Sequence, residues 1–208
     1  MAFGAVADRI AVALGLTVWP GRIPLNERAT MPTLHHFRLC PHSRAVRFAL
    51  GELGAEVVLA DEQPWLWRPE LATLNPAGEL PVLVLDSGPV LCGLYAIAEY
   101  AAEASAHHAD GKRAPPLFPG SAVERAETRR LVDWFQFKLD REVTTHLLEE
   151  KVYGRLRAGE TSSPDVEALG AARSNLKYHL AYAAHLLERR SWLAGEEMQG
   201  RARTLIDL

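Results

Sequence analysis

The stretch LCPHSRAVRFAL, residues 39–50, joins a strand pattern to an amphipathic helical pattern, and a cysteine stands at the junction. Residues 33–37 predict the strand, and residues 43–53, followed by Gly54 as a cap, predict the helix. A thiol just before a helix meets unpaired N–H groups and the positive end of the helix dipole, which lower its pKa below roughly 8.5. Cys40 is therefore a candidate catalytic residue, although a free cysteine at a strand end also packs well as a small apolar residue.

The pattern continues with a strand, then a hairpin, then a second helix. The expected strands cover residues 56–60, 80–85 and 89–91, and the expected helix covers residues 93–103. Asp86, Ser87 and Gly88 separate the last two strands and form a hairpin signal. The order β-α-β followed by β-β-α predicts a thioredoxin-like α/β domain over residues 31–104.

The second half of the chain predicts an all-α domain. A linker rich in proline and glycine covers residues 105–120, and Ser121 with Glu124 has the spacing of a helix capping box. Apolar side chains then recur every fourth residue from 131 to 147. Ser163, with Pro164 at the first helical position, predicts the N-cap of another helix. The apolar positions of that helix are Leu169, Leu176, Leu180, Ala183 and Leu187. Because these two helices lack an obvious third partner for their apolar stripes, we expect the helical domain, residues 121–208, to be incomplete at its C-terminal end.

Composition and charge exclude several classes of partner. A formal net charge of -3 gives no electrostatic case for nucleic acid or an anionic membrane, and no apolar run is long enough to span a bilayer. Two cysteines exclude a disulfide scaffold and favour a reducing compartment, the cytoplasm. Residues 1–30 include an apolar run over 10–19 without a basic segment before it. We interpret them as an N-terminal extension or a misassigned start before Met31, with a short helix of unassigned role as the alternative.

Four motifs resemble the glutathione S-transferase superfamily. They are LCPHS (39–43), NPAGELPVLV (75–84), AIAEY (96–100) and WLAG (192–195). The resemblance extends from Thr33 to about Gly195 and implies a thioredoxin-like N-terminal domain followed by an all-α C-terminal domain. Members of the superfamily usually continue beyond the WLAG motif into further helices.

Four longer segments are similar to the FzlA (FtsZ-localised protein A) branch of this superfamily. They are EQPW (62–65), RLVDWFQFKLDREV (130–143), LLEEKVYGRL (147–156) and NLKYHLAYAAHLLERRSWLAG (175–195). That branch acts in cell division by binding the tubulin-like polymer FtsZ rather than by known transferase chemistry. The similarity therefore implies FtsZ as a partner, and a homodimer stays open because the superfamily is commonly dimeric.

The resemblance also gives roles to individual residues. Cys40 and Ser43 are the candidate catalytic residues, and because Ser43 stands where a second cysteine would complete C-x-x-C, only monothiol chemistry is open. Leu80 and Pro81 resemble the cis-proline turn whose backbone pairs with glutathione in the family, although such a turn also simply shapes the fold. Glu79 is a weaker candidate for a contact with the glycyl end of glutathione.

Two positions argue against strong glutathione binding. Transferases usually place an acidic residue and a serine at the start of the helix after the hairpin, where they hold the γ-glutamyl end of glutathione. The matching residues here are Gly93 and Leu94, which offer no polar side chain. Each polar group of the ligand left unpaired costs about 1–3 kcal/mol. Two such losses weaken binding by a factor on the order of a hundred or more.

The remaining candidates are histidines and tryptophans. His35 and His36 lie in a predicted strand and point to opposite faces, so they do not form a chelating pair, and we expect no metal. His42 is a candidate for lowering the pKa of Cys40. Trp65, Trp134 and Trp192 are interpreted as core or interface anchors rather than cofactor contacts.

Two functions follow from these observations. The first is an FzlA-like protein that binds FtsZ filaments and regulates division without strong glutathione chemistry. The alternative is a glutathione S-transferase or a glutathione-dependent thiol transferase that uses Cys40.

Overall fold

A mixed four-stranded sheet forms the first half of the chain. The computed structural model describes residues 31–105, 117–157, 163–190 and 193. The strands are β1 (Thr33–His36), β2 (Val58–Asp61), β3 (Val82–Val84) and β4 (Val90–Cys92), in the spatial order β2-β1-β3-β4. Strand β1 is parallel to β2 and antiparallel to β3, and β3 forms an antiparallel hairpin with β4. This topology confirms the predicted thioredoxin-like layer.

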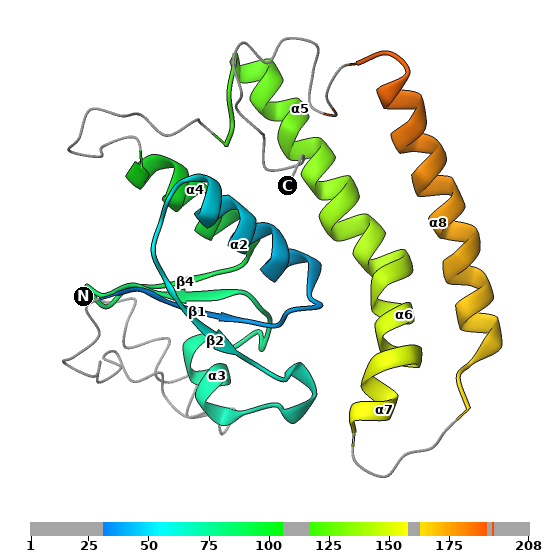
Figure 1. Cartoon of the computed structure of the whole chain (residues 1–208), viewed down its shortest axis with the longest axis horizontal. Coiled ribbons are helices and arrows are strands. Elements are labelled where there is room, and N and C mark those ends of the chain that lie inside the picture. The colour runs from blue at the N-terminus through cyan, green and yellow to red at the C-terminus, as the bar shows by residue number, and fades with distance from the viewer. Residues whose placement is uncertain (1–30, 106–116, 158–162, 191–192, 194–208) are drawn as a thin grey trace, which may run out of the picture.

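Helices cover both sides of the sheet. Helices α2 (Pro41–Glu52) and α4 (Leu94–Ser105) lie on the side that turns toward the second half of the chain (Figure 1). The short helices η1 (Pro64–Leu66) and α3 (Pro69–Leu74), which the sequence did not predict, lie on the opposite side. The strands and helices predicted for this half are present, with ends that differ from the prediction by at most two residues.

Two of these shifts have clear physical reasons. Helix α2 begins at Pro41 rather than at Ser43, because proline suits the first helical turn and the Cys40 side chain caps the helix. Strand β2 begins at Val58 rather than at residue 56, because its pairing starts where the Val58 N–H donates to the carbonyl of Pro32.

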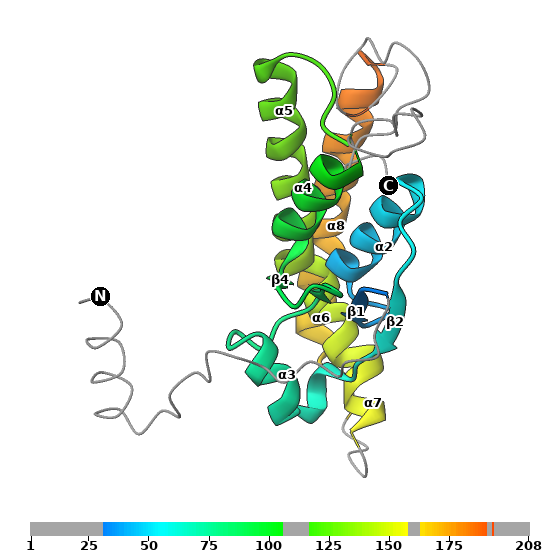
Figure 2. The same cartoon turned by 90° about the vertical axis from the view of Figure 1, so that its left-hand side faces the viewer.

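The second half of the described chain is helical, as predicted. One long rod runs through α5 (Ala122–Val132), α6 (Thr145–Leu148) and α7 (Gly154–Leu156), and helix α8 (Val166–Leu187) runs antiparallel beside it (Figures 1 and 2). Three π-helical segments interrupt the rod: η2 (Asp133–Lys138), η3 (Asp140–Thr144) and η4 (Glu149–Tyr153). The predicted capping box is confirmed, with Ser121 and Glu124 each bonding the other's backbone N–H.

Two predictions about helix α8 are wrong. Its N-cap is Asp165, not Ser163, because the Asp165 carboxylate accepts the N–H groups of Glu167 and Ala168. The N–H of Asp165 in turn donates to the Glu150 carboxylate at 2.8 Å, which fixes the cap against η4. Two of the predicted apolar positions, Leu180 and Leu187, are more than half exposed. The helix instead buries Ala172, His179 and Leu186, which repeat every seven residues along one face.

One apolar core joins the sheet layer to the helical half. It combines residues from β1, α2, β3 and α4 with Leu131 and Val132 of α5 and Leu186 of α8. Polar contacts reinforce the junction, since Arg129 pairs with Glu99 of α4 at 2.6 Å and the Tyr95 hydroxyl lies 2.7 Å from the Arg129 carbonyl. Residues 1–30, Trp192 and residues 194–208 carry predictions that lie outside the described part of the chain.

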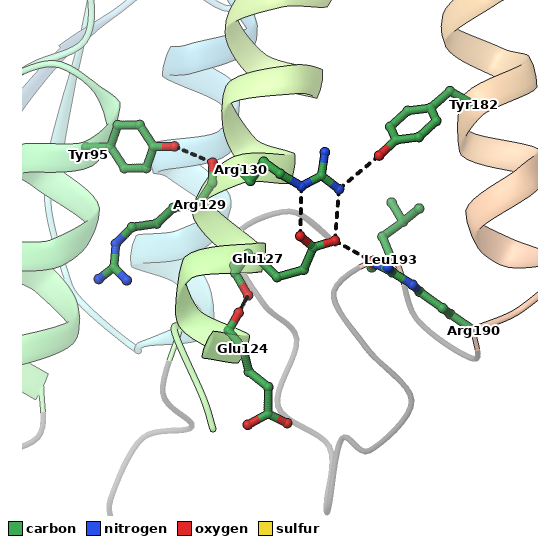
Figure 3. A network of polar contacts seen from close by, with 9 residues as sticks. Tyr95, Glu124, Glu127, Arg129, Arg130, Tyr182, Arg190 and Leu193 are labelled. Carbon is green, nitrogen blue, oxygen red and sulfur yellow. Dashed lines mark hydrogen bonds and ion pairs between the residues drawn. The ribbon is translucent and has the colours of Figure 1, made fainter. Parts of the chain in front are cut away.

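A carboxylate on α5 binds Arg190, just beyond the end of α8, and Arg130, which reaches Tyr182 of α8 (Figure 3). The side chain of Glu127 accepts two hydrogen bonds from Arg130, at 2.7 and 2.8 Å, and one from Arg190, at 3.0 Å. Arg130 also donates to the Tyr182 hydroxyl, and Arg190 to the carbonyl of Leu193. The hydrogen bonds from Arg130, opposed by partial burial and aided by Arg190, lower the pKa of Glu127 to about 2.

We expect Glu127→Gln to lower the free energy of unfolding at pH 7 by about 1 kcal/mol, because both arginines lose a charged acceptor. The depressed pKa makes this contribution pH-dependent. It is fully present above about pH 4.5 and is lost as the pH falls toward 2. Urea unfolding at pH 7 and pH 3 measures it, with Glu56→Gln as the control because Glu56 is exposed. An equal loss of stability at both pH values would contradict the assignment.

Candidate functional site

A cavity of about 430 Å³ opens where the N-terminus of α2 faces the long helical rod. The sheet half contributes Cys40, His42, Leu80 and Leu94, among others, and the rod contributes Phe137, Asp140, Arg141, Thr145, Leu148 and Tyr153. A larger and more open groove of about 520 Å³ runs along α2 and β2. No cysteine or histidine lines that groove, so we assign the candidate site to the cavity at Cys40.

Cys40 occupies the N-cap of α2. Its sulfur accepts the N–H of Ser43 at 3.4 Å and lies 3.9 Å from the carbonyl of Leu80. Burial disfavours the thiolate, but hydrogen bonds from His42 and from Ser43 more than offset it, so the pKa of Cys40 lies below its ordinary value. The sulfur of the second cysteine, Cys92, lies 3.7 Å from the Leu74 carbonyl, and burial raises its pKa.

His42 is held by the helical rod. Its Nε2 lies 2.9 Å from the backbone carbonyl of Gln136 and 4.0 Å from the Asp140 carboxylate. Its ring stacks on Phe137 at 4.6 Å between centroids, and Phe137 stacks in turn on Tyr95. Burial lowers the pKa of His42, but the Cys40 sulfur, the Gln136 carbonyl and Asp140 outweigh it, and the net shift is upward. Burial also raises the pKa of Asp140.

The predicted glutathione-binding turn lies beside the thiol. The Leu80–Pro81 peptide bond is cis, as predicted, and Leu80 lines the cavity. Glu79 lines the cavity as well. Ser43 does not; its side chain is fully buried, and its hydroxyl accepts the Phe37 N–H at 3.4 Å. Of the four predicted site residues, the structure therefore brings Cys40 and Leu80 to the cavity surface.

Gly93 and Leu94 also line the cavity, at the start of α4. Leu94 is almost completely buried, and Gly93 has a φ of 86°, a region that side-chain-bearing residues rarely adopt. This end of the cavity consequently presents an apolar side chain and backbone, with neither the acid nor the hydroxyl that a γ-glutamyl group would need.

The rod residues are the part of the site that sequence reasoning missed. Phe137, Arg141, Thr145 and Leu148 follow one another at spacings of four, four and three residues, so they share one face of a helix. The spacing shows that these residues share a helix face. It does not show that this face of the rod turns toward Cys40. Tyr153 completes the wall, and burial, with Cys40 and other acidic neighbours, raises its pKa to about 12.

The other candidates lie outside the cavity. Trp65 packs in an aromatic cluster with Phe37 and Tyr153, at ring-centroid distances of 5.5 and 5.3 Å. This packing agrees with the interpretation of Trp65 as a core anchor. Trp134 packs 4.5 Å from Tyr182 of α8. His35 bonds Glu62 at 2.8 Å, while His36 is buried. Within the described residues no cluster could hold a metal ion, and no helix there is long and apolar enough to cross a bilayer.

Comparison with known proteins gives the family. The family described as "Glutathione S-transferase, N-terminal domain" matches residues 39–104. FtsZ-localized protein A of Caulobacter vibrioides is 44% identical over 170 residues, which are 80% of this chain and 70% of that protein. The chain belongs to the FzlA branch of the glutathione S-transferase superfamily.

Solved structures agree with this assignment. FzlA from C. crescentus is 41% identical, with a TM-score of 0.73 over 86% of this chain and 74% of that one. A glutathione S-transferase from Sinorhizobium meliloti is 38% identical, with a TM-score of 0.75 and the same coverage. The predicted superfamily, branch and fold class are therefore confirmed.

We expect the pKa of one cysteine to lie below, and the pKa of the other to lie above, that of an ordinary thiol, which is about 8.5. Cys40 should be alkylated with a pH midpoint below that value, because His42 and the Ser43 N–H stabilise its thiolate. Cys92 should have a midpoint above it, because burial disfavours its thiolate. Iodoacetamide kinetics on Cys92→Ser and Cys40→Ser variants measure each thiol alone, and coincident midpoints would refute the assignment.

Proposed function

We propose that this chain binds FtsZ filaments in the cytoplasm and acts in cell division through the surface of a glutathione-transferase fold. The observation that carries the proposal is the 44% identity to FtsZ-localized protein A, which extends over the sheet half and the helical half alike. The long rod and helix α8 hold three of the four segments that resemble FzlA, so the likeness is not confined to the shared thioredoxin-like layer.

The geometry of the cavity disfavours glutathione chemistry, and this supports FtsZ binding as the function. The γ-glutamyl end of glutathione carries a charged amine and a carboxylate, and Leu94 and Gly93 offer them no side-chain partner. A polar ligand group that is desolvated without a partner costs about 1–3 kcal/mol. Glutathione would therefore bind weakly, without a side-chain anchor for its γ-glutamyl end.

A second candidate is a glutathione-dependent transferase or thiol transferase that uses Cys40. The observation in its favour is the environment of Cys40. Its sulfur accepts the Ser43 N–H and lies beside the Leu80 carbonyl, and His42 lowers its pKa. In this candidate Ser43 is a supporting residue that donates its backbone N–H to the sulfur. Pro81 supports the turn that presents the Leu80 backbone. A homodimer remains a prediction.

We expect the full chain to sediment with FtsZ polymerised in GTP and to stay in the supernatant with FtsZ in GDP. Because the interaction is proposed to use the protein surface, Cys40→Ser should sediment to the same extent. A glutathione transferase of the same fold from outside the FzlA branch serves as the control for bulk trapping. If the chain pellets no more than this control, FtsZ binding is ruled out as its function.

We expect glutathione to bind no more tightly than the millimolar range, because the γ-glutamyl anchor is replaced by Gly93 and Leu94. Isothermal titration calorimetry on the full chain measures this directly. Micromolar binding that disappears in Cys40→Ser would instead favour the second candidate and would exclude FtsZ binding as the sole function.

A further inference from the structure

We propose that the groove between α2 and β2 binds the extended C-terminal end of a partner protein, with the terminal carboxylate held by Arg47. The groove has a volume of about 520 Å³ and shares no lining residue with the cavity at Cys40. The proposal goes beyond FtsZ binding, and its test uses a peptide rather than FtsZ, so the failure of one proposal leaves the other standing.

The first argument concerns the backbone of β2, the outermost strand on one side of the sheet. The N–H groups of Val58 and Glu62 both donate toward β1. Because successive residues of a strand direct their backbone groups to alternate sides, those of Leu59 and Asp61 point away from β1. Among the described residues no strand pairs with this edge. An open edge of this kind is a template for an added strand.

The side chains at this edge are apolar. Val58 and Leu59 are about half exposed, at 49% and 51%. Natural edge strands usually carry charged residues that discourage pairing, but Asp61 is the only charged residue in β2. Leu59 lines the groove together with Val57 and with Leu50 of α2. An extended chain that pairs with β2 would therefore place alternate side chains against these three residues.

The second argument concerns Arg47, which lines the groove from α2. Its Nε is buried and has no hydrogen-bond partner among the described residues, and no carboxylate there forms an ion pair with its guanidinium. Buried donors in folded proteins are usually satisfied, so an unpaired one calls for an explanation. A planar guanidinium binds the two oxygens of a carboxylate through two parallel hydrogen bonds. Arg47 therefore points to a ligand with a carboxylate.

The position of Arg47 sets the direction of the bound chain. Helix α2 joins the parallel strands β1 and β2, so its early residues lie near the C-terminal ends of both strands. Arg47 precedes Leu50 and Gly51 in α2, and helical side chains lean toward the helix N-terminus. Its guanidinium therefore lies toward the Asp61 end of β2. Burial, and after it Arg47, lowers the pKa of His36, the register partner of Asp61, which agrees with this placement. A chain whose terminal carboxylate reaches Arg47 consequently runs parallel to β2.

The other charged groups near the groove favour the same direction. Glu56 lines the opposite end, before β2 begins, and would repel a carboxylate placed there. His36 adds no charge at neutral pH, because burial lowers its pKa. Asp61 and Arg38 both act on His36 and carry opposite charges. Arg47 is thus the groove-lining group that attracts a carboxylate.

These features define the ligand as an extended chain that ends at Arg47. Its last and third-last side chains face the groove, since alternate side chains of a strand share a face, and both should be apolar. Backbone hydrogen bonds to Leu59 and Asp61 supply affinity that does not depend on sequence, while the carboxylate and the two apolar side chains supply specificity.

The ligand class is tested with the fluorescein-labelled hexapeptide GSTVTV, which ends in a free carboxylate, and with the same peptide ending in an amide. Fluorescence anisotropy measures the binding of each peptide to the full chain. We expect the acid to bind about tenfold more tightly than the amide, because the amide loses the charged hydrogen bonds to Arg47. Equal affinities, or no binding of the acid at millimolar concentration, would overturn the proposal.

The role of Arg47 is tested by substitution. Arg47→Gln should remove most of the difference between the acid and the amide. Arg44→Gln is the matched control, because Arg44 is an exposed arginine of the same helix and does not line the groove. An equal effect of both changes would show that general charge attracts the peptide, and the proposal is overturned. Thermal unfolding reports the folding of each variant. If Arg47→Gln does not fold, Arg47→Lys should still lose part of the difference, because an ammonium cannot form the two parallel hydrogen bonds.

Amide hydrogen exchange on the full chain locates the bound peptide. The N–H groups of Leu59 and Asp61 should exchange more slowly with the acid peptide bound, while those of Val58 and Glu62 already donate toward β1 and should change little. Binding without protection at Leu59 would place the peptide elsewhere and overturn the proposal. If a second copy of this chain occupies the edge instead, Leu59 should be protected without peptide and sedimentation velocity should show a dimer, which would overturn it as well.

Discussion

Helix α4 packs against the sheet layer and against the helical rod at the same time. This double contact fixes how the two halves of the described chain are arranged. Leu94, Ile97 and Ala98 are almost completely buried in the core that α4 shares with the sheet layer. Tyr95 and Glu99 reach the helical rod instead, through Arg129. Because one helix serves both halves, the rod cannot shift relative to the sheet without exposing apolar surface, at about 25 cal/mol for each Å².

The candidate site is a consequence of this fixed junction. The rod is held close enough to α2 for the Gln136 carbonyl to accept from His42, a residue 94 positions earlier in the chain. The π-helical turns of η2 and η3 belong to the same stretch that supplies Phe137 and Asp140. The lowered pKa of Cys40 is therefore not a property of the thioredoxin-like layer alone, since His42 takes its position from the helical half.

Local signals in the sequence predicted local structure well. The hairpin at Asp86–Gly88 and the capping box at Ser121 depend on residues within a few positions of one another, whereas the cis peptide before Pro81 was expected from the family resemblance. The N-cap of α8 was mistaken because two residues suited to capping, Ser163 and Asp165, lie two positions apart, and it is the Asp165 carboxylate that accepts the N–H groups of the first turn. The rod side of the cavity escaped prediction for a different reason: a helix face is readable from spacing, but its partner is set by tertiary packing.

The cavity also separates two properties that a glutathione-dependent enzyme combines. Binding of glutathione requires polar side chains at the start of α4, where this chain has Gly93 and Leu94. Stabilisation of a thiolate requires the Ser43 N–H and His42, which lie at the start of α2. The two sets of groups belong to different helices and share no hydrogen bond, so one can be absent while the other persists. A reactive thiol in a protein that binds FtsZ would then involve no contradiction, because neither role needs the γ-glutamyl anchor.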